Sequence, residues 1–131
     1  MLLRSVSSLM LLVVLLLTGC KKDVDEGPGT LQNKWNLVSY ITNSHFANAD
    51  HNDVITGKSG DYMDFQADGK LAVRILSQDY VSIYKTTGTN VILDGTDEYV
   101  IVKLTGKQLV LSQKTFISSQ DYTEKTFKLS R

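Results

Sequence analysis

The chain has 131 residues, of which 42% are hydrophobic and 21% are charged, and its 14 basic and 14 acidic side chains cancel. This length suits one domain of ordinary size, and the apolar share is enough to build a packed core. Because charges of both signs are interspersed, no basic surface of the kind that binds nucleic acid is indicated, and we expect no nucleic-acid partner.

A short apolar leader opens the chain. Arg4 supplies a positive charge, residues 9–17 are all apolar, and the small residues Thr18 and Gly19 follow. This order is typical of an export signal. A helix over the apolar run would rise only ~14 Å, about half of the ~30 Å hydrocarbon core, so a permanent transmembrane helix is the poorer interpretation. We predict a signal peptide over residues 1–19.

The chain contains a single cysteine, Cys20, directly after this leader. The run Leu-Leu-Thr-Gly-Cys resembles the lipobox of bacterial lipoproteins, in which the thiol takes a diacylglycerol and the leader is cut off before it. The resemblance implies that Cys20 is the lipid attachment site and the first mature residue. The alternative, an incidental cysteine after an ordinary signal, would leave an unpaired thiol in an oxidising compartment. Two acyl chains anchor a protein stably, so we expect membrane attachment through this residue.

Residues 20–30 show no apolar periodicity and are rich in polar residues, Pro and Gly, which predicts a flexible tether. Lys21 is not the aspartate associated with inner-membrane retention in enterobacteria. A lysine closely followed by acids resembles the surface-export signal of Bacteroidota lipoproteins. We therefore expect a lipid-anchored protein of the bacterial cell envelope, in the outer membrane, with the periplasmic or surface face left open.

Beyond the tether, apolar and polar residues alternate between short turns, which predicts an all-β domain over residues 31–131. Asp-Gly pairs at 68–69 and 94–95 lie between alternating runs and indicate tight hairpins. The run 98–104 is the most apolar and predicts a central strand. Eight short strands joined by hairpins predict an antiparallel meander closed into a small barrel, because closure removes exposed edges. A two-sheet sandwich is the alternative.

Several short runs carry a resemblance to the lipocalin-like domain of small Bacteroidota lipoproteins: Asn33-Lys34-Trp35, residues 65–70, residues 99–105 and residues 109–111. The resemblance implies a lipocalin-like barrel in which Trp35 plugs the closed end. It also implies a basic side chain from the end of the last strand, Lys128 or Arg131, above that tryptophan.

The inward faces of the predicted strands are expected to line the barrel, and these side chains are the ligand candidates: Trp35, Leu37, Phe65, Val73, Ile83, Ile101, Leu111 and Phe127. An eight-stranded barrel either holds one small ligand or is filled by its own side chains. The same residues could line a ligand pocket or fill the interior as a core.

The longest predicted connection, residues 42–60, contains both histidines, His45 and His51, with Asp50 and Asp53 beside the second. A connection of this length is usually functional or disordered. A metal site, a lid over the barrel mouth and a plain solvated loop remain open as interpretations. The spacing does not fit an EF-hand, and we predict neither a metal nor a cofactor.

No serine lies in a Gly-x-Ser-x-Gly elbow and no phosphate-binding loop is indicated, so we expect no enzyme. The sequence predicts a membrane-anchored lipoprotein with a non-catalytic lipocalin-like domain that binds a small apolar ligand in the barrel. The alternative is a structural or interaction lipoprotein with a filled barrel, which presents its loops to a protein or glycan partner.

Overall fold

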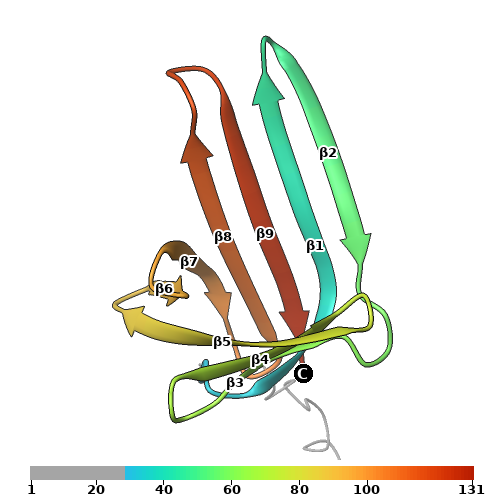
Figure 1. The fold of residues 1–131 in the computed structure, drawn as a ribbon, viewed down its shortest axis with the longest axis vertical. Coiled ribbons are helices and arrows are strands. Elements are labelled where there is room, and N and C mark those ends of the chain that lie inside the picture. The colour runs from blue at the N-terminus through green and yellow to red at the C-terminus, as the bar shows by residue number, and fades with distance from the viewer. Residues whose placement is uncertain (1–28) are drawn as a thin grey trace, which may run out of the picture.

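The computed structural model describes residues 29–131, so the predicted leader, Cys20 and most of the tether lie outside the described residues. The described chain is all-β, as predicted, and contains no helix that could span a membrane (Figure 1). Its strands are β1 (Lys34–Phe46), β2 (Ala49–Thr56), β3 (Tyr62–Phe65), β4 (Lys70–Ile75), β5 (Gln78–Thr87), β6 (Asn90–Leu93), β7 (Asp97–Leu104), β8 (Gln108–Phe116) and β9 (Tyr122–Ser130).

The strands form one antiparallel sheet in the order β2-β1-β3-β4-β5-β6-β7-β8-β9, and β1 also pairs with β9. This additional pairing closes all of the strands except β2 into a barrel. The predicted eight-stranded meander and its closure are confirmed, with β2 as an extra strand outside the barrel.

Strand β1 has two partners on one of its edges. Its lower part, residues 34–36, pairs with β3, and its upper part, residues 39–46, pairs with β2. Between them the chain bulges against β9 at Val38, and the amide of Gly57 donates to the carbonyl of Val38 at 2.9 Å. A Cβ at Gly57 would lie 1.8 Å from the carbonyl oxygen of Leu37, so only glycine fits at this crossing.

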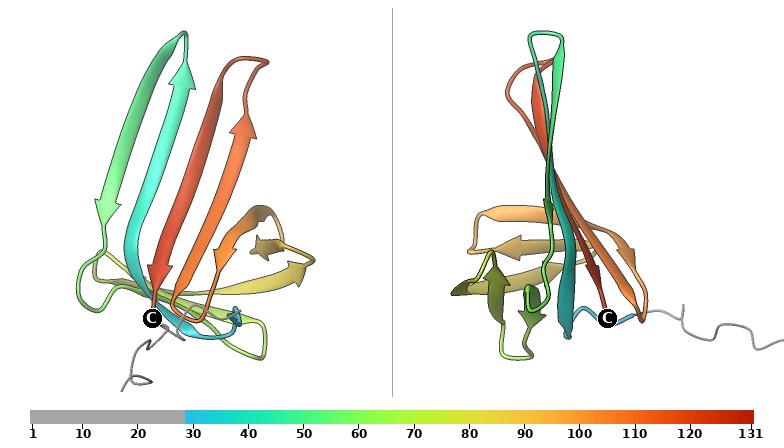
Figure 2. Two further views of the ribbon diagram at one scale, coloured as in Figure 1. Left: turned by 180° about the vertical axis from the view of Figure 1, so that it is seen from behind. Right: turned by 90° about the vertical axis from the view of Figure 1, so that its right-hand side faces the viewer.

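The long hairpins β1–β2 and β8–β9 project beyond the barrel and form one continuous sheet (Figure 1). We call it the raised sheet and define it as β2, residues 39–46 of β1, residues 112–116 of β8 and residues 122–128 of β9. Seen from the side, it stands clear of the barrel, and no other strand of the described chain covers it (Figure 2). Both ends of the described chain lie at the opposite end of the barrel.

The core forms from residues that alternate along each barrel strand, as period-two patterning requires. Met63 and Phe65 of β3 and Leu71 and Val73 of β4 point inward. The buried apolar side chains form one cluster: Leu31, Trp35, Leu37, Met63, Phe65, Leu71, Val73, Val91, Tyr99, Leu109, Leu111 and Leu129.

The predicted Asp-Gly turns are confirmed, with positive φ at Gly69 (85°) and at Gly95 (76°). The expected central position of the most apolar strand was wrong. Val100 and Val102 of β7 are exposed, because every strand of a closed barrel has one face toward solvent.

Candidate functional site

The interior of the barrel holds most of the predicted ligand candidates. Five of them belong to the buried core, and two more are partly buried against it. The five are Trp35, Leu37, Phe65, Val73 and Leu111, and the two are Ile101 and Phe127. They come from β1, β3, β4, β7, β8 and β9, so the fold brings them to one place.

Ile83 is the exception, and the prediction that it faces the interior was wrong. Its side chain is 60% exposed, and it pairs with the exposed Lys70 on β4. Ser82 pairs with the buried Leu71, and Tyr84 meets the ring of Phe65 edge-on at 5.1 Å. Strand β5 carries large side chains on both faces, so its apolar pattern could not determine which face points inward.

The lower part of the barrel interior is packed. Trp35, Val91, Leu109 and Leu111 have 0% exposure. An internal void large enough for a ligand would leave accessible surface on the side chains that line it. Among the described residues, no buried side-chain nitrogen or oxygen lacks a hydrogen-bond partner, so no polar group there awaits a ligand.

Trp35 closes the lower end of the barrel. Its indole Nε1 donates to the carbonyl of Leu31 at 2.9 Å, which satisfies the one polar group of a fully buried ring. The guanidinium of Arg131 lies 5.8 Å from the centre of the ring. Arg131 therefore takes the place that the resemblance implied for Lys128 or Arg131.

An aromatic cluster lies at the upper end of the barrel interior. Tyr40 stacks on Phe127 at 4.5 Å between ring centres, and Tyr99 approaches Phe127 at 5.6 Å. Burial, followed by the nearby Tyr40, raises the pKa of Tyr99 well above its usual value. The sequence did not indicate this cluster, because the bulge at Val38 reverses the alternation of β1 and turns Tyr40 inward.

The predicted long connection over residues 42–60 was wrong. Most of it forms the upper part of β1 and the whole of β2, joined by a turn at Ala47 and Asn48 with φ of 49° and 62°. Positive φ at both central residues is typical of the tight turn that fits twisted hairpin strands. The polar residues here gave no alternation, because both faces of a raised hairpin meet solvent.

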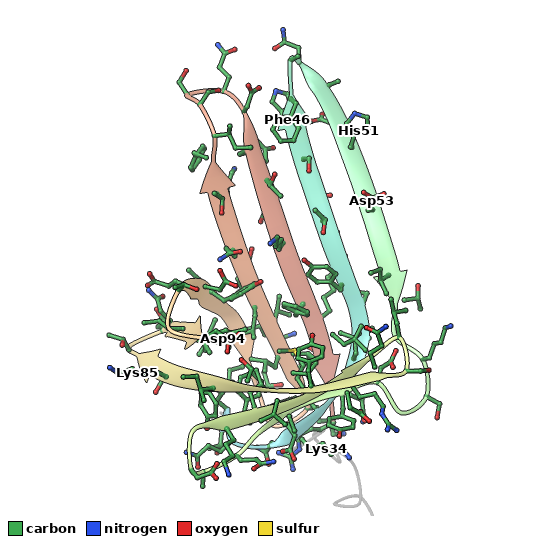
Figure 3. The ribbon with its side chains drawn as sticks, in the orientation of Figure 1. Lys34, Phe46, His51, Asp53, Lys85 and Asp94 are labelled. Atoms are coloured by element: carbon green, nitrogen blue, oxygen red, sulfur yellow. The ribbon has the colours of Figure 1, made fainter. Side chains whose placement is uncertain are left out.

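The raised sheet has two faces, which we define by its cross-strand pairs. The inner face continues the barrel interior and carries Tyr40, Thr42, Ser44, Phe46, His51, Asp53, Ile55, Gln113, Thr115, Thr123, Lys125 and Phe127. The outer face carries Ser39, Ile41, Asn43, His45, Asp50, Asn52, Val54, Thr56, Ser112, Lys114, Phe116, Tyr122, Glu124, Thr126 and Lys128. Figure 3 shows Phe46 near the turn of the first hairpin and His51 and Asp53 along β2.

The two histidines therefore lie on opposite faces of the sheet. His45 Nδ1 lies 2.5 Å from a carboxylate oxygen of Asp50, while His51 shares its face with Asp53. Residues 29–131 contain no group of three or more His, Cys, Asp or Glu side chains placed to hold a metal ion.

The outer face carries an aromatic and cationic cluster near the turns. The ring of His45 stacks on Tyr122 at 5.6 Å, and Phe116 meets Tyr122 at 6.1 Å. Lys114 places its ammonium 3.9 Å from the centre of the Tyr122 ring. Phe116 and Ile117 remain 65% and 63% exposed, which is unusual for such large apolar side chains near each other on a monomer surface.

One open hollow lies on the raised sheet and a second lies at its edge. One, of about 230 Å³, is lined on β1, β2 and β9 by Asn43, Ser44, Asp50, His51, Asn52, Tyr122 and Glu124. The other, of about 420 Å³, lies between the start of β7 and the upper part of β8 and is lined by Thr96, Glu98, Val100, Ser112, Gln113, Lys114 and Thr115. We call the second hollow the β7–β8 notch. Both are open to solvent.

Comparison with known proteins gave no match: no protein-family model, no curated protein and no solved structure matches this chain.

Proposed function

We propose that this protein is a non-catalytic lipoprotein of the bacterial cell envelope, held to the membrane by lipid on Cys20, that presents its raised sheet to a protein or glycan partner. The observation that supports this function is the packed lower part of the barrel interior, where Trp35, Leu109 and Leu111 have no accessible surface. A partner is therefore expected to bind the outside of the domain.

The small apolar ligand predicted inside the barrel remains the second candidate. It is favoured by the resemblance to lipocalin-like domains, by the closed barrel and by the position of Arg131 over Trp35. The packed core argues against it, because a ligand of ordinary size needs a pocket of about 300 Å³ or more.

The fold is suited to display from a membrane. The described chain begins and ends at the lower end of the barrel, and the hairpin turns lie at the other end (Figure 1). A lipid on Cys20 would place the lower end toward the bilayer. Strand β1 alone has 13 residues and spans ~40 Å at ~3.3 Å per residue. The turns would then stand well away from the lipid surface.

Fractionation of cells tests the anchor. Cys20→Ser is expected to move the protein from the membrane fraction to the soluble fraction and to abolish labelling by a palmitate analogue. Thr18→Ser, which keeps a small residue in the leader, is the matched control and is expected to leave both unchanged. A Cys20→Ser chain that stays in the membrane would refute the lipid as the tether. On a density gradient, the parent protein is expected with the outer membrane.

Native mass spectrometry tests the two candidate functions against each other. Protein from its own host is expected to show the mass of the lipidated chain with no additional small molecule. A small molecule that is retained repeatedly, and lost from a Leu111→Trp variant that adds volume to the core, would favour a barrel ligand instead. Leu76→Trp, at an exposed turn position, is the control for the added ring.

A further inference from the structure

The raised sheet ends in two unpaired strand edges. Strand β2 pairs with β1 and with no other strand of the described chain. Strand β8 pairs with β7 only as far as Ser112, whereas its pairing with β9 continues to Phe116. Residues 113–116 therefore have one free edge. Unpaired edges expose rows of backbone N–H and C=O groups that are ready to pair with another strand.

We propose that these two edges pair with each other between copies, so that β2 of one copy adds antiparallel to the free edge of β8 of the next. The partner of the raised sheet is then a second copy of this chain. This inference rests on the proposed function in one respect: the common membrane anchor sets the orientation of the copies.

The strand directions allow this pairing without turning a copy over. Strands β1 and β8 run toward the turns, and β2 and β9 run back toward the barrel (Figure 1). When two copies stand side by side with their lower ends on one bilayer, β2 of the first meets β8 of the second in opposite directions. The antiparallel alternation of the sheet then continues across the contact. Antiparallel pairing of β2 with β2 would require one copy to point its lower end away from that bilayer.

The register between the two copies follows from the cross-strand pairs within one copy. Asp50 pairs with His45, His45 with Tyr122, and Tyr122 with Phe116, so Asp50 and Phe116 stand at the same level. Copies at equal height would therefore place residues 50–53 opposite residues 116–113. The whole free edge of β8 is used, and each residue keeps its face.

The charges of the two edges are complementary in this register. Strand β2 carries Asp50 and Asp53 and no Lys or Arg, while residues 113–116 carry Lys114 and no acid. Asp50 would lie diagonally across from Lys114 on the outer face, within reach of a long side chain. Pairing of β2 with itself would offer no cation of Lys or Arg to these carboxylates.

The β7–β8 notch gives the incoming strand room to continue. After residue 53 the strand meets the level of Ser112, where β7 already occupies the edge of β8. The notch opens at this level and measures about 420 Å³. Val54 of the incoming strand and Val100 in the wall of the notch are both exposed in the single chain, and the contact would bury them together.

Cysteine cross-linking tests the pairing in cells. One tagged copy carries His51→Cys and a second, differently tagged copy carries Thr115→Cys, which are opposite each other in the proposed register and suit disulfide geometry. Mild oxidation is expected to give a mixed dimer from the two together and no dimer from either alone. A chain with both substitutions is expected to give a ladder of higher oligomers, because each copy offers both edges. In the control, Thr87→Cys on β5 replaces Thr115→Cys.

Each other result overturns the proposal. Homodimers of His51→Cys or of Thr115→Cys would show like edges pairing. A mixed dimer no more abundant than with the Thr87→Cys control would show that the charged edges prevent pairing, as edge charges often do. Charge reversal is a second test of the pairing. Lys114→Glu is expected to lower the yield of the mixed dimer by about two- to fivefold, and Asp50→Lys in the other copy is expected to restore the yield.

The proposed lipid anchor and the proposed edge pairing can be refuted independently of each other. Every cross-linking pair is made both with Cys20 and with Cys20→Ser. The parent chain, whose only cysteine is Cys20, shows whether Cys20 forms a disulfide between copies. Palmitate labelling without a mixed dimer would overturn the edge pairing and leave the lipoprotein proposal standing. A mixed dimer in concentrated Cys20→Ser protein, together with no labelling of the parent, would overturn the anchor and leave the edge pairing standing.

Discussion

The backbone amide of Ala47 donates a hydrogen bond to Oδ1 of Asp121 at 3.1 Å, which joins the turn of the β1–β2 hairpin to the turn of the β8–β9 hairpin. The carbonyl of Asp121 also accepts the amides of Ile117 and Ser118, at 2.9 and 3.2 Å. The two hairpins therefore meet at their turns as well as along β1 and β9, and the raised sheet acts as one unit.

Removal of this contact is expected to loosen the turns without unfolding the barrel. Asp121→Ala removes an exposed hydrogen bond worth about 1 kcal/mol, so exchange of the Ala47 amide should accelerate by up to about tenfold. Asp121→Asn keeps an acceptor oxygen and is expected to preserve most of the protection. Hydrogen exchange measured by NMR checks both variants, and equal protection of Ala47 in Asp121→Ala would contradict the role of this bond.

The packed core predicts unequal costs for two aliphatic truncations. Leu111→Ala removes a fully buried side chain and is expected to destabilise the protein by about 2–5 kcal/mol, whereas Ile83→Ala, at an exposed position, should cost about 1 kcal/mol or less. Trp35 is the only tryptophan and is buried, so its fluorescence during urea unfolding reports the free energy of unfolding directly. Similar losses in both variants would contradict the packed interior or the outward direction of Ile83.

The barrel was predictable from sequence because each of its strands has one buried face and one face exposed to solvent. Alternation in β3 and β4 and the Asp-Gly pairs determined those hairpins, and closure followed from the number of short, hairpin-linked strands. The phase of β5 was not predictable, since Val81 and Ile83 on one face and Tyr80 and Tyr84 on the other are all large. There only the cross-strand register decides which face is buried.

The raised sheet was not predictable for a different reason. Alternation arises from burial of one face, and above the barrel neither face of β1 or β2 is buried. Residues 42–60 therefore looked like a loop, and the turn at Ala47 and Asn48 lacks the usual glycine. The strands form there because β1 pairs with β9 on one edge and β2 on the other, a contact between distant parts of the chain.

The turn between β4 and β5 is a site for stabilisation. Leu76 and Ser77 adopt φ of 54° and 63°, and a leucine in this left-handed region costs about 1 kcal/mol or more. Replacement of the pair by Asn-Gly, which favours this turn, is expected to raise the free energy of unfolding by about 1–2 kcal/mol. Urea unfolding checks the result. Asn-Gly in place of the exposed pair Ser118-Ser119 is the control and should bring no gain.

Stability at alkaline pH is expected to depend on Tyr99. Burial raises the pKa of Tyr99 in the folded protein, whereas in the unfolded chain its phenol titrates at about pH 10. The folded state thus favours the neutral phenol. Its contribution to stability is complete below about pH 10 and is lost as the pH rises further, because the unfolded chain releases the proton first.

Tyr99→Phe removes this titration and is expected to flatten the fall in the free energy of unfolding between about pH 9 and pH 11. Burial also raises the pKa of Tyr80, but its side chain is half exposed, so Tyr80→Phe should flatten the curve less. Urea midpoints of the three proteins at each pH give the comparison. An unchanged slope in Tyr99→Phe would mean that this phenol is solvated in the folded protein and that the aromatic cluster with Tyr40 and Phe127 does not bury it.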